Sequence, residues 1–272
     1  GDLVLEPKSL PMPSRVVLAV EFPVGRVEPV VRPGAAVREG QCVARDERGI
    51  LPDVRASVSG RVSEIRPWPG PFGRDVLSVV IESNGSDEEP ERLFEAGHPP
   101  RAMQDQLRLI SEAGIREADV YPWPLSVRIA QPALTPPVLF PFVPDLRRPL
   151  DFLVLNAVDR QPGVWLRRCS LEVLAEEILE SLPILKALSG AEKTLLAVTK
   201  QQVLSESLDR GLRMEGVEVV RCPDRYPIAL EPMLVQHLTG REVPQPSGDA
   251  RAVGTVVLDV VTAARTAQTL RD

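Results

Sequence analysis

Closely spaced turns between short apolar runs constrain residues 33–82 to a compact β-structure. Apolar residues recur at nearly every second position beside these turns, which is typical of strands with one buried face. The turns are marked by Pro33-Gly34, Glu39-Gly40 and Ser59-Gly60, and the apolar positions by Ala56, Val58, Val62 and Ile65. Residues 76–82, VLSVVIE, add another strand.

Such short strands bury a core only when two sheets pack face to face. We therefore predict an independent β-sandwich over residues 16–82, beginning with a strand at 16–22. The pattern further predicts an exposed hairpin around Val58–Arg61 and no helix between Ala56 and Ile65.

The order of turns and strands resembles the biotinyl/lipoyl-carrier domain. Carriers present a lysine on the hairpin between the two halves, because its amine forms the amide bond to biotin or lipoate. The corresponding segment here, ARDERGILPDVRA at residues 44–56, holds no lysine. The carrier chemistry is therefore excluded, and we expect the domain to be structural or to provide a docking surface.

The second half of the chain alternates predicted strands and helices, which is typical of an α/β domain with a mostly parallel sheet. A buried strand is expected at Phe152–Val158, and Ser170 is a plausible N-cap for a helix that ends at Gly190. Strands then follow at 194–199, 217–221 and 255–260, with helices at 201–214, at 230–239 and from 262.

The sequence between the two patterns sets the expected domain boundaries. Residues 83–101 are polar, acidic and interrupted by prolines, which is typical of a linker. A helix is predicted at 102–114, followed by a proline-rich, loop-like stretch at 116–150. We expect a barrel-sandwich hybrid domain with an extended lead-in at residues 1–90, a linker at 91–101 and an α/β domain at 102–272.

Composition excludes several classes of function. The net charge of -6 opposes a nucleic-acid surface. The longest apolar run, residues 150–158, is far below the roughly 20 residues that span a bilayer. Three scattered cysteines and two histidines offer no iron–sulfur or metal set. We expect a cytoplasmic location, with any association with the inner membrane passing through partner subunits.

Five segments in order resemble the RnfC family over nearly the full chain. They are LPMPSRVVLAV, RPGAAVREGQCVA, ASVSGRVSEIRPWPGPFGRDVLSVVIE, ISEAGI and RYPIALEPMLVQHLTGREVP. The resemblance implies a subunit of a membrane electron-transport complex, with other redox subunits as partners. It also implies a barrel-sandwich hybrid followed by an α/β domain similar to the flavin-binding subunit of respiratory complex I, which in the family uses FMN and NADH.

The cofactor motifs of that family are altered here. The glycine-rich loop that cradles phosphate is replaced by READVYPWPLSVR, which carries carboxylates and Pro122 at the glycine positions. The family's NGAECEP corresponds to Asn156–Pro162, with Asp-Arg-Gln for Glu-Cys-Glu, and YPSGGEK corresponds to Tyr226–Pro232, without its glycines and lysine.

These changes predict a vestigial cleft that is acidic or plugged, binds neither FMN nor NADH, and leaves a scaffolding role. Its predicted lining is Glu117, Asp119, Trp123, Asn156, Asp159 and Glu231. One alternative is a flavin- or NADH-dependent oxidoreductase with a diverged site, in which Trp123 stacks on a ring and Arg128 or Arg160 holds phosphate. Another is an adaptor that binds a different small ligand in the old pocket.

Overall fold

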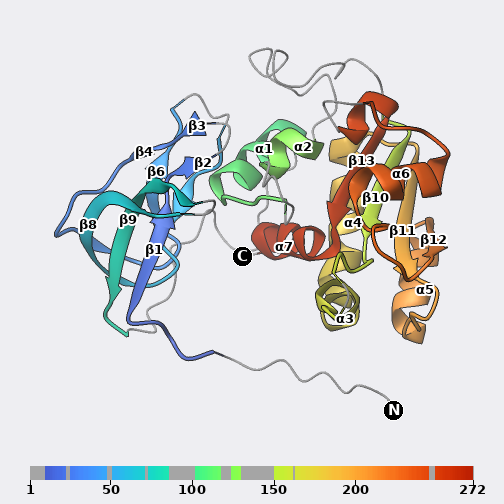
Figure 1. The fold of residues 1–272 in the computed structure, drawn as a ribbon, viewed down its shortest axis with the longest axis horizontal. Helices are drawn as coiled ribbons and strands as arrows, with labels where there is room; N and C mark the ends of the chain where they lie inside the picture. The colour runs from blue at the N-terminus through green and yellow to red at the C-terminus, as the bar shows by residue number, and fades with distance from the viewer. Residues whose placement is uncertain are drawn as a thin grey trace. The chain divides into compact units, whose positions relative to one another are not determined.

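The chain divides into two compact units, each described separately below (Figure 1). The computed structural model describes residues 10–22, 25–47, 51–70, 73–85, 102–117, 124–129, 150–161, 163–244 and 249–271. The first unit holds Gly1–Pro99 and Arg108–Ile115, and the second holds Pro100–Leu107 and Arg116–Arg271. The sequence pattern places the whole segment 102–115 in the α/β domain, whereas part of it belongs to the first unit.

The first unit is built from antiparallel sheets, drawn in blue and teal in Figure 1. The largest has the order β1 (Arg15–Ala19), β9 (Asp75–Ser83), β8 (Gly60–Pro69) and β5 (Ala36–Val37). A second contains β4 (Glu28–Pro29), β6 (Cys42–Arg45) and β7 (Val54–Arg55), and a third pairs β2 (Glu21–Phe22) with β3 (Gly25–Arg26). The buried core consists almost entirely of valine, leucine, isoleucine and alanine from these strands and their turns. The predicted barrel-sandwich hybrid is confirmed.

Most of the hairpin predicted to be exposed at Val58–Arg61 is buried instead, and Arg61 is its one exposed residue. Val58 is 2% exposed and Ser59 is 3% exposed. The Ser59 hydroxyl accepts a hydrogen bond from Glu39 N–H at 3.0 Å, and its carbonyl accepts one from Asn84 N–H at 3.1 Å. These contacts fold the turn onto neighbouring segments. No helix interrupts residues 56–65, as predicted, and a bulge between Val62 and Glu64 explains why the period-2 pattern slips before Ile65.

Gly60 shows why this turn requires glycine. A Cβ at this position would lie 2.0 Å from the Glu82 carbonyl oxygen on β9. We expect Gly60→Ala to destabilise the first unit by about 1–3 kcal/mol, because β8 and β9 would have to separate locally. Chemical denaturation of the variant checks this. Gly34→Ala is the control, because a Cβ there would meet open space while the backbone has a strained φ of +88°. It separates backbone strain from steric overlap, and we expect it to lower the stability less than Gly60→Ala.

The C-terminal part of α1 (Met103–Glu112) packs within the first unit. Asp53 N–H donates to the Ser111 carbonyl at 3.1 Å, and Arg55 donates to the carbonyls of Glu112 and Gly40. Gly114 ends this segment in the left-handed region, at φ +74°, where a Cβ would lie 2.5 Å from the Asp53 carbonyl oxygen. These contacts explain why the end of the predicted helix belongs to the first unit.

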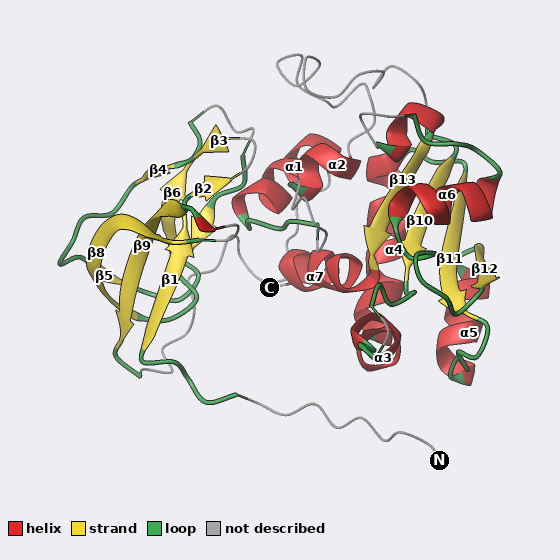
Figure 2. Cartoon of the chain, viewed as in Figure 1, coloured by secondary structure: helices red, strands yellow, loops and turns green. Residues whose placement is uncertain are grey.

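The second unit contains a parallel sheet covered by helices, as predicted. Its order is β12 (Val217–Cys222), β11 (Lys193–Thr199), β10 (Phe152–Asn156) and β13 (Thr255–Asp259), and all three pairings are parallel. In Figure 2, α6 (Glu231–Thr239) crosses in front of the sheet and α4 (Ala175–Ser189) lies behind it. The remaining helices are α2 (Leu125–Ile129), α3 (Leu166–Val173), α5 (Glu206–Met214), α7 (Val260–Arg271) and the short 3-10 helix η4 (Ala250–Val253).

The helix predicted to start at Ser170 starts earlier and is interrupted. Ser170 lies inside α3, whose N-cap is Trp165, so the N-cap prediction is wrong. Leu174 separates α3 from α4, and α4 ends at Gly190 in the left-handed conformation, as predicted. The sequence pattern does not indicate α2, because the proline-rich composition around it obscures its single turn of apolar residues.

Candidate functional site

The topological switch point of the parallel sheet, called the crevice below, lies at the carboxyl ends of β10 and β13. From β10 the chain adds β11 and then β12 on one side, and it then returns to place β13 on the other side of β10. The strand order therefore reverses at β10. In open α/β sheets this reversal of strand order is where ligands bind. The register places Asn156, the last residue of β10, opposite Asp259, the last residue of β13. These two positions define the candidate site.

Asp259 at this crevice is held by an internal ion pair. Arg167 from α3 donates to one Asp259 carboxylate oxygen, and their side chains are only 8% and 4% exposed. The same guanidinium donates to the Val158 carbonyl at 2.9 Å. The other Asp259 oxygen accepts from Val261 N–H, in the first turn of α7, at 2.8 Å. Arginine and aspartate together therefore fill the end of β13.

Glu117 joins the same cluster. It is 5% exposed, and its carboxylate accepts a hydrogen bond from the Asp259 backbone N–H at 2.6 Å. Glu117 thus reaches the end of β13. The carboxylate binds a backbone group of the protein itself.

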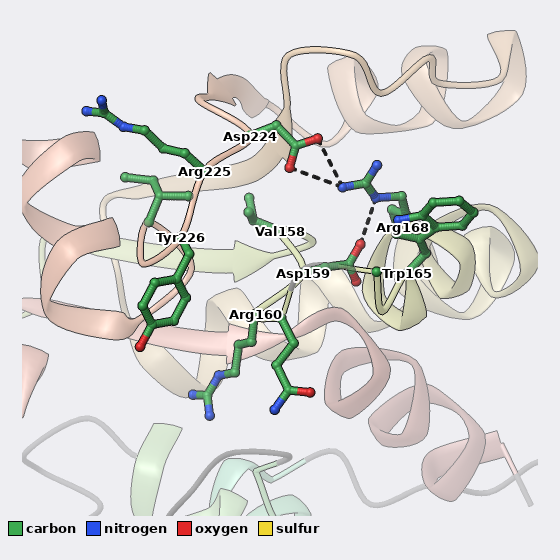
Figure 3. Close-up of a pocket in the computed structure, with 11 residues that line it drawn as sticks. Val158, Asp159, Arg160, Trp165, Arg168, Asp224, Arg225 and Tyr226 are labelled. Atoms are coloured by element: carbon green, nitrogen blue, oxygen red, sulfur yellow. Dashed lines mark hydrogen bonds and ion pairs between the residues drawn. The ribbon is translucent and has the colours of Figure 1, made fainter.

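Asp159 caps the N-terminus of α3. One carboxylate oxygen accepts from Arg167 N–H at 2.8 Å, and the other accepts from Arg168 Nε at 2.7 Å. Arg168 also reaches Asp224 at 3.4 Å, as Figure 3 shows. Burial lowers the pKa of Arg168, but the hydrogen bond and charge of Asp159 outweigh this and raise the pKa above its usual value. The positive end of the α3 dipole is therefore satisfied by an internal carboxylate.

Asn156 connects the loop after β10 to the loop before α6 by hydrogen bonds. Its side-chain amide donates to the Ala229 carbonyl at 3.2 Å, and its side-chain oxygen accepts from Val158 N–H at 3.0 Å. The residue is 3% exposed. These contacts tie the segment after β10 to the segment before α6.

Glu231 belongs to a second buried cluster, with Arg128 of α2. The two side chains form an ion pair and are 11% and 7% exposed, while the other Glu231 oxygen accepts from Ala250 N–H at 3.1 Å. Burial lowers the pKa of Arg128, but the carboxylates of Glu231, Asp249 and Glu117 raise it well above its usual value. Arg128 is thereby committed to protein carboxylates.

Asp249 extends this cluster through Arg251, which is 2% exposed. Arg251 donates from three atoms to the Asp249 carboxylate and from a fourth to the Val127 carbonyl at 2.9 Å. Burial raises the pKa of Asp249, but the hydrogen bonds and charge of Arg251, with the charge of Arg128, lower it below its usual value.

The depressed pKa of Asp249 predicts an acid-labile second unit. The stabilisation is fully present above the unfolded pKa of about 3.9 and is lost as pH falls through the lower folded value. We expect Asp249→Asn to lower stability at neutral pH and to flatten its dependence below about pH 4. Hydrogen exchange of the β13 amides, at neutral pH and in the acid range, measures both effects in the second unit alone. An unchanged acid dependence in the variant would contradict the assignment.

Four of the six predicted lining residues are at described positions, and the structure places them at three different parts of the second unit. Glu117 and Asn156 lie at the ends of β13 and β10, Asp159 caps α3, and Glu231 pairs with Arg128. Asp119 and Trp123 lie outside the described residues. The sequence did not indicate Arg167, Asp249, Arg251 or Asp259 as site residues, although Arg167 and Arg168 closely follow the segment at residues 156–162.

A cavity of about 250 Å³ opens beside this region, between the loops that follow β10 and β12 (Figure 3). Val158 and Ile228 give it apolar wall area, and Arg168 with its two aspartates gives it polar wall area. The remaining lining residues are Arg160, Gln161, Gly163, Trp165, Arg225 and Tyr226. The cavity is smaller than the roughly 300 Å³ at which pockets for drug-sized ligands begin.

The thiol pKa of each of the three cysteines is raised above its usual value. Burial and the neighbouring Asp53 raise the pKa of Cys42 to about 11, and burial alone raises that of Cys222 to about 11. Within the described ranges, no group of three or more histidine, cysteine, aspartate or glutamate side chains could hold a metal ion. Nor does any helix in that part of the chain have the length and apolar character to cross a membrane.

Comparison with known proteins matches both units. Residues 6–86 match the RnfC barrel sandwich hybrid domain, and residues 110–268 match the Nuo51 FMN-binding domain. A solved NAD+-reducing [NiFe]-hydrogenase in the H2-reduced state has a similar fold, with a TM-score of 0.50 and 20% identity, over 62% of this chain and 31% of that one.

Two curated relatives align along nearly the whole chain. One, from the proton-translocating ferredoxin:NAD(+) oxidoreductase complex of Clostridium ljungdahlii, is 28% identical over 93% of this chain and 53% of its own length. The other, the corresponding component of the Na(+)-translocating complex of Acetobacterium woodii, is 29% identical over 95% and 56%. The chain thus spans about half the length of these relatives. The two domain matches, in this order and covering most of the sequence, show that the chain belongs to the RnfC family.

Proposed function

We propose that this chain is a structural subunit, or part of one, in an ion-translocating redox complex, and that it holds neither FMN nor NADH itself. The first half of the proposal comes from the relatives, which are named as components of ferredoxin:NAD(+) oxidoreductase complexes. The second half comes from the crevice at β10 and β13. Its single strongest support is the buried Arg167–Asp259 ion pair at the switch point of the sheet.

The residues present do not fit a flavin phosphate or a nucleotide. Phosphate binds at helix N-termini because unpaired backbone N–H groups point at it. Here the first turns of α3 and α7 already donate to Asp159 and Asp259. A phosphate would have to displace these carboxylates or lie beside them, at a cost on the order of 1 kcal/mol per charge pair even at a high effective dielectric.

Two buried arginines of this region are also committed to protein carboxylates. Arg167 is buried against Asp259, and Arg128 is buried against Glu231. Recruiting either guanidinium for a ligand would strip a buried carboxylate of its partner, which costs several kcal/mol. The charges of these arginines are therefore balanced by carboxylates of the protein, where an anionic cofactor would otherwise balance them.

The competing function is an oxidoreductase that binds its cofactor through rebuilt contacts. The cavity beside β10 favours it, because Trp165, Tyr226 and Arg160 line the same space and offer stacking and charge. The absorption spectrum of the purified protein separates the two functions. The scaffold predicts a colourless protein, and a flavin band at near one equivalent that survives gel filtration would establish the oxidoreductase instead.

A further inference from the structure

The loop before α3 and the outer face of α3 expose an unusual set of apolar side chains. Val164 is 46% exposed, Trp165 40%, Leu166 64% and Val173 52%. Leu166 and Val173 are seven residues apart, two helical turns, so they share one face of α3. Such a gathering of exposed apolar side chains on one helix and the loop before it makes this surface a candidate interaction site.

The opposite face of α3 packs against the rest of the second unit. Arg167 and Leu171 are buried there, against the crevice and the core. The helix is therefore fixed in rotation, and its exposed apolar face cannot turn inward without breaking the Arg167–Asp259 pair. The exposed face is a fixed feature of the second unit.

The cavity beside β10 adjoins this surface through Trp165, which is both exposed and part of the cavity lining. Its volume of about 250 Å³ suits one large apolar or aromatic side chain better than a drug-sized ligand. Protein interfaces concentrate their binding energy where such a side chain fills a pocket, and tryptophan, tyrosine and arginine dominate these positions. All three residue types line this one.

The charges at the cavity favour an acidic partner. Three arginines line it, Arg160, Arg168 and Arg225, against two aspartates. Both aspartates bond to Arg168, whereas exposed Arg225 forms no ion pair with any residue that the structure describes. On a chain of net charge -6, an exposed arginine at the cavity favours a partner that presents a carboxylate there.

We propose that the apolar face of α3 and the adjoining cavity dock an acidic segment of another subunit of the redox complex. The segment inserts one large apolar side chain into the cavity and places a carboxylate at Arg225. This rests on the proposed membership in such a complex, because it takes the occupant to be a partner subunit. Neither a cofactor nor a second copy of this chain is required.

Photo-cross-linking in the intact, membrane-bound complex tests the proposal. Benzoylphenylalanine is placed at Leu166 or Val173, and at Met214 of α5 as a control that is 82% exposed. We expect cross-links from the two α3 positions to a different subunit, in a segment that carries a large apolar residue flanked by aspartate or glutamate. Met214 is expected to give none to that segment.

Charge reversal provides the second arm. Arg225→Glu is expected to lower the cross-link yield at least about fivefold, because like charges at an interface repel. Arg210→Glu, on exposed α5, should leave the yield unchanged. Cross-links to lipid, to a second copy or to a basic segment would overturn the proposal, as would none above the Met214 level.

The outcome is separable from that of the scaffolding role. If the complex stays assembled and cross-links form only elsewhere, the docking surface is wrong while membership in the complex stands. If the protein binds flavin but Leu166 still cross-links to an acidic segment, the cofactor prediction is wrong while the docking surface stands.

Discussion

Arg167→Met is expected to destabilise the second unit by about 3–5 kcal/mol, because it leaves the buried Asp259 carboxylate without its partner. The variant also loses the hydrogen bond to the Val158 carbonyl and weakens the joint between α3 and β10. Hydrogen exchange of the β10 and β13 amides measures the second unit alone, since a chain of two units does not unfold in one transition.

Two further variants give this prediction its controls. Arg213→Met removes an exposed ion pair of α5, with Asp209, and is expected to change stability by less than about 1 kcal/mol. The double variant Arg167→Met with Asp259→Leu removes both buried charges and is expected to recover much of the loss. If Arg167→Met were as mild as Arg213→Met, the crevice would not depend on this pair.

Glu231→Gln is the second variant with a large expected effect, also about 3–5 kcal/mol. Glutamine keeps the shape and can still accept from Ala250 N–H, but it removes the charge that balances the buried Arg128. Asp249 lies near enough to influence Arg128, yet it is already bonded to Arg251 and offers limited compensation. Hydrogen exchange of β13 and α6 reports the loss.

Glu180→Gln is the matched control, since it neutralises a carboxylate paired with Arg271 while both side chains are nearly half exposed. Its expected effect is below about 1 kcal/mol. Equal stability of Glu231→Gln and Glu180→Gln would show that Arg128 finds another partner, and that the second cluster is not a structural replacement for a ligand site.

Local patterns in the sequence predicted most of the architecture. Turn residues such as Gly34 and Gly40 are read directly, because a positive φ is a property of a single residue. Strands and helices are also indicated locally, by the spacing of apolar residues, and their alternation predicted the parallel sheet. The exposed hairpin at Val58–Arg61 was wrong because burial of Ser59 depends on Glu39 and Asn84, which are distant in sequence.

The candidate site was predicted less completely, since ion pairs join residues from separate elements. Asp259 and Arg167 are 92 positions apart, and Glu231 and Arg128 are 103 apart. The resemblance to the family predicts that the glycines of a phosphate loop are replaced, but it does not indicate which distant side chains pair at this place in the fold. The sequence therefore predicted a cleft that is acidic or plugged, without identifying the arginines that pair with its carboxylates.

Isothermal titration of the purified chain with FMN and with NADH tests the central claim most directly. We predict no binding of either at micromolar concentration, because Asp159, Asp259 and Glu117 bond to the protein's own N–H groups and arginines at the crevice. A dissociation constant in the micromolar range or below, for either compound, would contradict this account and show that the altered residues form a working cofactor site.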